Sequence, residues 1–213
     1  MTKKIMFNDK YCLTQAVLNG TKTMTRRVLK VPKTCNGKEV YSFNILTNSL
    51  GTQCVDLIDY GGNVLDSWKP HYEVGEVVAI AQPYKDIYPN ADFEMIGDGF
   101  MTESAGWTNK MFVKANLLPH HIRITDVKVE RLQDISDDDI MREGVKRASI
   151  GFYAEGVKVK DCEKEAHRET SSGCLKLFPF PRPAFASLID KISGKGTWES
   201  NPFVVAYSFK LID

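Results

Sequence analysis

The segment 121–132, His-Ile-Arg-Ile-Thr-Asp-Val-Lys-Val-Glu-Arg-Leu, alternates apolar and polar side chains. A period of two is the pattern of a strand that buries one face and leaves the other in water. The segment 202–211 alternates in the same way, with Phe203, Val205, Tyr207 and Phe209 on one face. We therefore expect both segments to be strands of a sheet with one covered face.

Shorter runs of strand-forming residues occur elsewhere, and Gly, Asn and Pro residues separate many of them. These runs lie at 3–7, 39–46, 53–58, 63–66 and 77–81. Short strands bounded by turn-forming residues are typical of hairpins and small barrels. We therefore expect several short strands joined by turns.

A first helix is expected over residues 9–19. Their apolar side chains have mostly helical spacing, and Asp9 is placed to cap the start. Gly20 follows and is able to end a helix in the left-handed conformation.

Two further helices are expected toward the carboxyl end of the chain. Ser136 is a strong N-cap followed by three acids, and this helix should stop near Gly144. Residues 184–192 form a short apolar helix pattern. The intervening proline-rich segment 178–183 is expected to form neither helix nor central strand, because proline lacks the backbone N–H.

The remaining segments lack a regular pattern. Residues 84–116 are loop-like and aromatic, and residues 146–178 are charged and broken, which predicts an exposed excursion. The length of 213 residues favours a single domain, 1–213, with insertions at about 31–70 and 146–178. Short strands mixed with short helices predict the α+β class, as a small β-barrel with peripheral helices.

Composition excludes several classes of protein. An apolar fraction of 43% and a charged fraction of 26% are ordinary for a globular chain. No run approaches the roughly 18 apolar residues of a membrane helix, and the amino terminus lacks the apolar core of a signal peptide. We expect a cytoplasmic protein with no membrane contact. Because the net charge is only +1, polyanion binding must come from a local patch.

The five cysteines are an odd number and include no Cys-x-x-Cys pair. Cys162, His167 and Cys174 could offer three metal ligands, but their spacing matches no standard zinc pattern. His120 and His121 precede a strand without an acidic ligand placed beside them. We therefore predict reduced thiols, no metal and no cofactor.

Residues 20–27, Gly-Thr-Lys-Thr-Met-Thr-Arg-Arg, place three cations and three hydroxyls directly after the first expected helix. No acid lies among Lys22, Arg26 and Arg27, so they form an anion-seeking spot unless distant carboxylates neutralise them. The threonine hydroxyls could bind phosphate or, activated by a base, attack a carbonyl. The alternative is an ordinary solvated basic turn, since most charge runs lie at the surface.

Four blocks of sequence occur in a telling order. The segment 20–27 comes first, and a Val-Gly-Glu turn at 74–76 then leads into an apolar strand. The blocks at 124–145 and 192–210 follow. They read Ile-Thr-Asp-Val-Lys-Val-Glu-Arg-Leu-Gln-Asp-Ile-Ser-Asp-Asp-Asp-Ile-Met-Arg-Glu-Gly-Val and Ile-Ser-Gly-Lys-Gly-Thr-Trp-Glu-Ser-Asn-Pro-Phe-Val-Val-Ala-Tyr-Ser-Phe-Lys. This string resembles the ASCH domain family, in particular its longer phage- and prophage-associated members.

The resemblance implies a PUA-like β-barrel with a cleft suited to an RNA segment or a nucleoside-sized ligand. The family includes an amidohydrolase that removes the acetyl group from N4-acetylcytidine. Its catalytic lysine, threonine and glutamate match Lys22, Thr25 and Glu143. Arg27 matches the arginine that closes the family's first motif.

The chemistry of these residue types is consistent with that role. A lysine crowded by Arg26 and Arg27 has its neutral form favoured, which suits Lys22 to act as a base. Thr25 is then the nucleophile or orients the substrate carbonyl, and Glu143 carries the proton to the leaving amine.

The chain departs from the family pattern after the strand at 77–81. Ala81 and Gln82 stand where many longer members carry an arginine and a glutamate, and Tyr84 replaces a tryptophan. An alanine cannot bind phosphate, so either the ligand differs or those charges were structural.

Further candidates are residues that could contact the ligand beside the three catalytic ones. These are Thr23, Arg26, Arg27, Gln82, Tyr84 and Trp107. Trp68 and Trp198 are also able to stack on a base, but Trp198 is favoured as a plug at one end of the barrel.

Three functions remain open from the sequence. The first is a module that binds RNA or a nucleotide in a cleft built around Lys22, Thr25, Arg27 and Glu143. The second is an enzyme that uses the same cleft, either an amidohydrolase on a modified nucleoside such as N4-acetylcytidine or a ribonuclease. The third is a phage-derived accessory factor that binds a protein partner through the aromatic loop.

Overall fold

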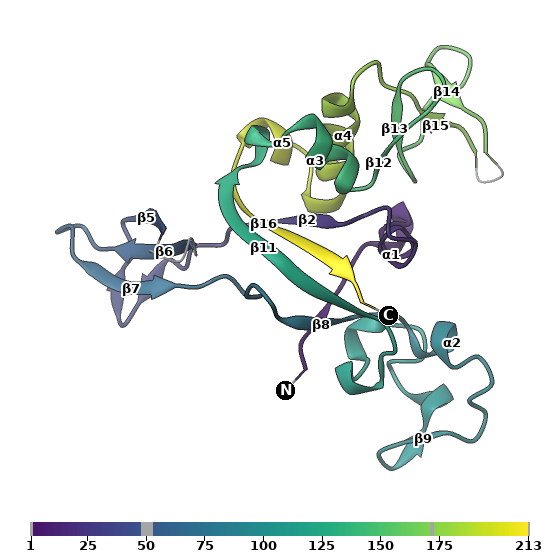
Figure 1. Ribbon diagram of the computed structural model, residues 1–213, viewed down its shortest axis with the longest axis horizontal. Coiled ribbons are helices and arrows are strands. Elements are labelled where there is room, and N and C mark those ends of the chain that lie inside the picture. The colour runs from purple at the N-terminus through teal and green to yellow at the C-terminus, as the bar shows by residue number, and fades with distance from the viewer. Residues whose placement is uncertain (1, 48–52, 171–172, 213) are drawn as a thin grey trace.

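The computed structural model describes residues 2–47, 53–170 and 173–212 (Figure 1). A five-stranded sheet crosses its centre in the order β1-β8-β11-β16-β2. These strands are β1 (Lys4–Ile5), β8 (Val77–Ile80), β11 (His121–Arg131), β16 (Phe203–Leu211) and β2 (Met24–Val28). The long pair β11–β16 is antiparallel, which confirms the two alternating segments as neighbouring strands.

The five-stranded sheet is open. β1 runs parallel to β8, the other neighbours are antiparallel, and β1 and β2 are its two edges. The described strands therefore form no closed barrel, and barrel closure stays a prediction of the resemblance. The mixed α+β class is confirmed.

The first insertion, 31–70, forms a separate antiparallel sheet that projects from the central one (Figure 1). Its strands are β5 (Ser42–Thr47), β6 (Gln53–Ile58) and β7 (Val64–Trp68), preceded by a small hairpin of β3 (Thr34–Cys35) and β4 (Lys38–Glu39). Val55 of β6 is fully buried in the main core cluster. Because β6 carries this core contact, the inserted sheet is anchored to the central one.

Helices cover the ends of the central sheet. They are α1 (Leu13–Leu18), α2 (Tyr84–Ile87), α3 (Asp137–Arg142), α4 (Pro181–Ser193) and α5 (Thr197–Ser200). The side chain of Ser136 caps α3 by accepting from the amide of Asp139, as expected. A short 3₁₀ turn, Asp9–Tyr11, precedes α1. The helix expected over 9–19 is therefore split in two.

The expectation that 178–183 excludes helix was wrong for its last three residues. α4 begins at Pro181 and includes Pro183. Proline is tolerated in the first helical turn, because the N–H groups there have no partner within the helix. The helix pattern seen at 184–192 is the continuation of this longer helix.

The second insertion, 146–178, is better packed than its charge suggests. The insertion is built from two hairpins. They are β12 (Val145–Arg147) with β13 (Phe152–Ala154), and β14 (His167–Arg168) with β15 (Leu175–Lys176). Of its apolar side chains, Tyr153, Ala154, Val157 and Leu175 are buried, whereas Ile150 is exposed. The exposed excursion expected here is therefore partly core, because short hairpins gather widely spaced apolar residues on one side.

The aromatic segment 84–116 forms its own small lobe, at the lower right of Figure 1. Besides α2 it holds the hairpin β9 (Met95–Ile96) with β10 (Gly99–Phe100) and several 3₁₀ turns. Its core is a separate apolar cluster around Tyr84, Met101 and Val113. Of the described helices, none combines the length and the apolar character needed to cross a membrane.

Gly156→Ala is expected to destabilise the protein, because a Cβ there would lie 2.5 Å from the carbonyl oxygen of Lys10. Gly37→Ala is the matched control, since φ is +76° at Gly37 and +72° at Gly156 but the space around Gly37 is open. Left-handed strain of about 1 kcal/mol is common to both variants. The clash adds about 1–3 kcal/mol for Gly156 alone. Equal losses in urea unfolding would show that the second insertion does not pack on the Lys10 turn.

Candidate functional site

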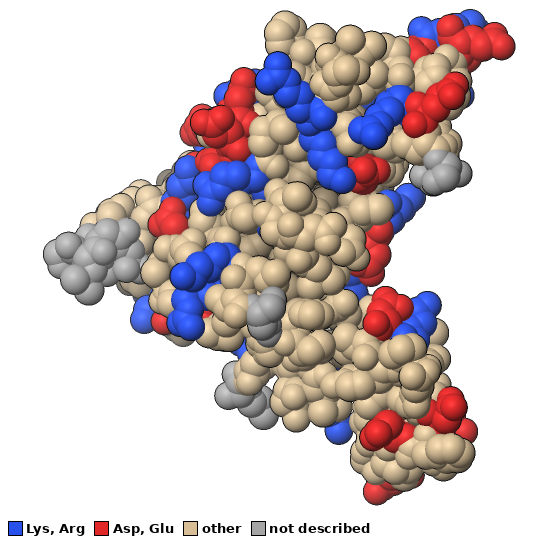
Figure 2. Space-filling model, turned by 45° about the vertical axis from the view of Figure 1, so that its right-hand side comes forward, with Lys and Arg blue, Asp and Glu red and all other residues tan. Residues whose placement is uncertain are grey.

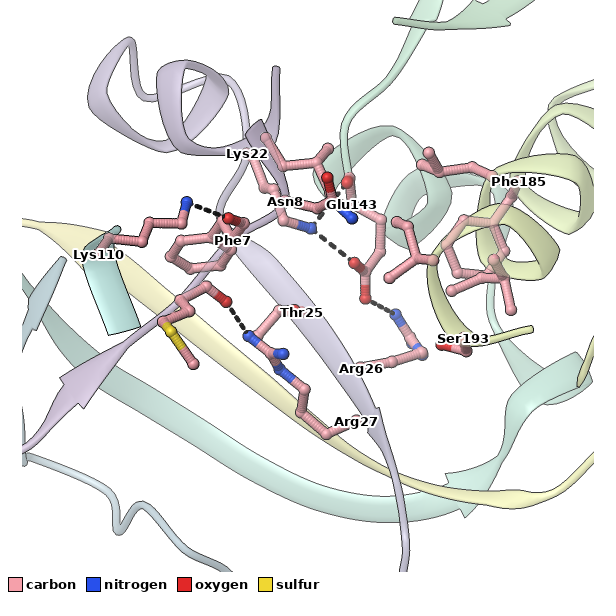
Figure 3. A pocket seen from close by; sticks show the side chains of 15 residues that line it. Phe7, Asn8, Lys22, Thr25, Arg26, Arg27, Lys110, Glu143, Phe185 and Ser193 are labelled. Atoms are coloured by element: carbon pink, nitrogen blue, oxygen red, sulfur yellow. Dashed lines mark hydrogen bonds and ion pairs between the residues drawn. The ribbon is translucent and has the colours of Figure 1, made fainter. Parts of the chain in front are cut away.

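A pocket of about 350 Å³ lies between β2, the end of α3 and one face of α4 (Figure 3). We call it the lysine pocket. Its polar lining comes chiefly from the basic segment 20–27 and consists of Asn8, Lys22, Thr25, Arg26, Arg27, Lys110, Glu143 and Ser193. Its apolar lining includes Phe7, Leu13, Phe185 and Leu188. The volume is that of a small-molecule site.

Lys22 reaches the pocket because the chain folds back after α1. Gly20 takes a left-handed φ of +69°, and the amides of Thr21 and Lys22 both donate to the carbonyl of Ala16. This confirms that the basic segment follows a helix C-terminus. The side chain of Lys22 is only 2% exposed. It is therefore not part of a solvated basic turn.

The amine of Lys22 has a complete set of acceptors. Its Nζ donates to the carbonyl oxygens of Met24 and Glu143 and to Oε2 of Glu143, each at 2.7 Å. Three acceptors match the three protons of an ammonium group. The structure therefore holds Lys22 in a geometry that suits its charged form.

Glu143 bridges two buried cations (Figure 3). Its Oε2 pairs with Lys22, and its Oε1 lies 3.2 Å from Nη1 of Arg26. Glu143 is the C-cap of α3, and Gly144 after it has a left-handed φ of +107°. A Cβ on Gly144 would lie 3.1 Å from Leu13 and 3.8 Å from the Lys22 side chain, so glycine allows this close approach.

Arg26 is held on all sides by carboxylates. Its Nε and Nη2 donate to Oε1 of Glu130 at 2.9 and 2.6 Å, and its Nη2 lies 3.4 Å from Asp139. Its side chain has no exposed surface. Carboxylates distant in the sequence therefore neutralise Arg26. Arg26 holds Glu143 in position and is not free to bind an anionic ligand.

Burial is the main reason that the pKa of Lys22 lies below its usual value of 10.5. Glu143 opposes this shift, and Arg27 and Arg26 add smaller effects in the lowering direction. The expected direction is present, but its cause differs from the sequence argument. Burial lowers the pKa of Lys22 more than the nearby charges of the two arginines do.

Thr25 and Arg27 also line the lysine pocket, and Thr23 does not. Thr25 is buried on β2, whereas Arg27 is exposed and its Nη2 donates to the carbonyl of Met6. Thr23 instead joins β2 to the end of α3. Its amide donates to the carbonyl of Arg142 at 3.0 Å, and its Oγ1 accepts from Nε of Arg142 at 3.2 Å. The structure thus brings Lys22, Thr25, Arg27 and Glu143 to one pocket.

Gln82, Tyr84 and Trp107 lie outside the lining of the lysine pocket. Tyr84 is buried in the core of the aromatic lobe, and its hydroxyl accepts from the amide of Lys114 at 2.6 Å. Trp107 is half-buried against the same cluster. Gln82 is buried, and its Oε1 lacks a hydrogen-bond partner among the described atoms. Buried oxygens without a hydrogen-bond partner are rare. Tyr84 and Trp107 pack in the apolar core of the aromatic lobe and do not contact the lysine pocket.

Lys110 is a pocket residue that the sequence did not single out. Its Nζ donates to the carbonyl of Phe7, to Oδ1 of Asp9 at 2.7 Å and to Oγ1 of Thr14 at 3.1 Å. The aromatic lobe thereby contributes a cation to the pocket rim. It belongs to no motif, and only the tertiary fold brings it there.

The apolar wall formed by α4 was also missed. Phe185 is fully buried, and its ring packs edge-on against Trp198 with centroids 6.0 Å apart. The proline-rich helix start hid the length of α4 from pattern analysis. Trp198 is half-buried against this helix, and with no closed barrel described it plugs none.

Metal ligands do not gather in the described part of the chain. No cluster of three or more His, Cys, Asp or Glu side chains is placed there to hold a metal ion. The cysteines are free, including Cys162 and Cys174. On the face that Figure 2 shows, basic and acidic side chains lie interspersed. Attraction for an anion therefore has to arise locally, at pockets that expose a cation.

The site can hold a polar ligand against an apolar wall, with a carboxylate and an ammonium on its floor and Arg27 at its rim. Comparison with known proteins adds no family to this geometry. Protein-family models, curated proteins and solved structures were each searched, and none matches this chain significantly.

Proposed function

We propose that the lysine pocket binds a nucleoside unit of RNA, in a module of the ASCH type with PUA-like architecture. The observation that carries this proposal is the buried ion pair between Lys22 and Glu143 on the floor of the pocket, at 2.7 Å. The order of the sequence blocks supports the family assignment, and the site stands on its own geometry.

A buried ion pair is a poor source of stability, because removing two charges from water offsets most of their attraction. Well-packed apolar residues would stabilise this floor equally well. A carboxylate and an ammonium beneath an open pocket instead suit a ligand that presents a donor beside an acceptor. Nucleobase edges have this pattern, and a glutamate accepts from the exocyclic amine of cytosine.

The rest of the lining suits the other parts of a nucleotide. Met6 and Ile192, which are partly exposed, provide apolar surface for a base, and Phe7 and Phe185 are buried in the same lining. Arg27 lies exposed at the rim, where a phosphate would be placed, whereas Lys110 beside it is paired with Asp9. Apolar walls with a few convergent polar groups are typical of small-ligand sites.

Deacylation of an N4-acylated cytidine is the second candidate. The lowered pKa of Lys22 and the presence of Thr25 in the same pocket favour it. In this reaction neutral Lys22 takes the proton of the Thr25 hydroxyl, and the oxygen attacks the acetyl carbon. The C–N bond then breaks, Glu143 relays the proton that Lys22 took from Thr25 to the leaving amine, and water hydrolyses the threonine ester to acetate and free Thr25.

Binding ranks first because of the hydrogen bonds of Lys22. All three protons of its ammonium have acceptors, so no lone pair faces Thr25. Catalysis requires the amine to lose a proton and at least one of these contacts. Binding requires no loss of a proton, only that the Lys22 ammonium shares one of these donations with the ligand.

Removing both charges of the buried pair is expected to weaken nucleotide binding while the fold survives. Removing one partner alone would destabilise the protein by about 3–5 kcal/mol, so the test uses the double variant Lys22→Met/Glu143→Gln. Hydrogen bonds to charged groups contribute about 1.5–3 kcal/mol. The affinity for cytidine monophosphate should therefore fall at least about tenfold in calorimetric titration.

The matched control is Lys146→Met/Glu155→Gln, which removes a half-exposed Lys–Glu pair of 3.0 Å on the β12–β13 hairpin. Its affinity for the same nucleotide should equal that of the wild type. Circular dichroism on heating confirms that both double variants are folded. A folded Lys22→Met/Glu143→Gln variant with unchanged affinity would rule out the lysine pocket as the nucleotide site.

If the pocket deacylates N4-acetylcytidine, kcat/KM is expected to rise with pH and to level off below pH 10.5. The neutral amine of Lys22 is the base, and burial lowers its pKa from 10.5, so its neutral fraction grows as pH rises through the lowered pKa. Acetate and cytidine are measured by chromatography. Turnover that persists in Lys22→Met, or that falls through this pH range, would contradict the mechanism.

A further inference from the structure

A second pocket lies on the other side of Arg27 and shares that residue and Met6 with the lysine pocket. We call it the tyrosine groove. It has a volume of about 410 Å³. The residues that define it are Arg27, Lys30, Trp68, His71, Tyr72 and Tyr207. Arg27 and Trp68 are candidates from the sequence, whereas the other residues of the groove are not.

The groove is basic, although the chain as a whole is nearly neutral. Its described lining includes Arg27 and Lys30, both exposed, and no Asp or Glu. Lys4 also lines it, but its amine turns away to donate to the carbonyls of Met111 and Val113, each at 2.7 Å. Arg27 and Lys30 are therefore the cations that the groove offers to an anion.

The other wall of the groove is aromatic and rigidly held. The rings of Tyr72 and Tyr207 meet edge-on with centroids 5.3 Å apart, and His71 meets Tyr72 at 4.6 Å. The hydroxyl of Tyr72 donates to the carbonyl of Lys4 at 2.9 Å, and the hydroxyl of Tyr207 accepts from the amide of His71 at 3.2 Å. Burial raises the pKa of Tyr72 to about 12, so the phenol stays neutral beside an anion.

Trp68 completes this wall and comes from the inserted sheet. It is the last residue of β7 and packs partly against the main core. Aromatic rings beside exposed cations are the combination that proteins use to bind single-stranded nucleic acid, with bases stacked on the rings and phosphates on the cations.

The two pockets meet on one face of the β2–β16 pair, and the lysine pocket also extends around the β2 edge to Arg26. Thr25 of the lysine pocket is paired directly with Tyr207 of the groove, and Arg27 is paired with Val205. In a strand, residues two apart lie on the same face, so Thr25 and Arg27 project together. Arg27 therefore stands at the junction of two adjacent pockets.

We propose that the tyrosine groove is a subsite for the nucleotide next to the one in the lysine pocket, so that the ligand is a single RNA strand rather than a free nucleoside. The phosphate between the two nucleotides lies on Arg27, and the second base stacks beside Trp68. This inference rests on the proposed function of the lysine pocket and names its substrate class.

The test compares cytidine monophosphate with a fluorescent cytidine trinucleotide of RNA. The trinucleotide should bind about tenfold more tightly, because stacking one base on an aromatic side chain has about that effect. Trp68→Leu keeps an apolar side chain against the core but removes the indole. It should abolish the gain of the trinucleotide and leave the affinity for the mononucleotide unchanged.

Two matched controls test the specificity of the effect. Tyr60→Leu removes an aromatic ring that is exposed at the β6–β7 turn, and Arg123→Gln removes an exposed arginine on β11. Both should bind the trinucleotide as the wild type does. Arg27→Gln should instead lower the slope of log affinity against log salt by about 0.7, the value for one phosphate of a single strand.

The outcomes separate this inference from the function on which it rests. Mononucleotide binding without a gain for the trinucleotide, or an equal gain when its flanking bases are replaced by abasic sites, overturns the second subsite alone. Equal competition by polyglutamate also overturns it, because the groove would then be a general polyanion patch. Failure of both ligands to bind overturns the proposed function as well.

Discussion

The carboxylate of Glu143 is the interaction on which the site depends. One oxygen pairs with Lys22 and the other with Arg26, so a single acid at the end of α3 pairs with two cations buried on and before β2. These two ion pairs connect the end of α3 to β2, an edge strand whose partner among the described strands is β16. Without Glu143, Lys22 would be a buried cation with carbonyl acceptors only, which is strongly destabilising.

The position of these ion pairs beside β2 also explains where the pocket opens. Because β2 is a sheet edge, its outer side is not covered by another strand. α4 approaches from one side with Phe185, and the aromatic lobe approaches from the other with Lys110. The pocket therefore lies where the main core cluster, the apolar cluster around α4 and the aromatic lobe meet, and a ligand within it would contact side chains from all three. Binding to the folded state alone would stabilise their arrangement.

Local patterns predicted the strands well and the site in part. The alternation at 121–132 and 202–211 identified β11 and β16, because one-sided burial leaves a period of two. Resemblance in block order brought Lys22 and Glu143 together, and their side chains do meet. Lys110 could not be found, because nothing local marks a lysine whose role is set by tertiary contact. Tyr84 was misplaced because aromatic loop residues and core residues look alike in sequence.

Adjacent arginines with opposite roles show why composition alone could not resolve the site. Arg26 and Arg27 are neighbours on β2, so their side chains leave opposite faces of the strand. Arg26 forms ion pairs with Glu130, Asp139 and Glu143 and so has a structural role. Arg27 is exposed between the two pockets. Strand parity thus divides one basic segment into a structural clamp and a ligand-facing cation. A shift of the strand by one residue would exchange the two roles, so the register of β2 with β16, which pairs Arg27 with Val205, determines where an anion can bind.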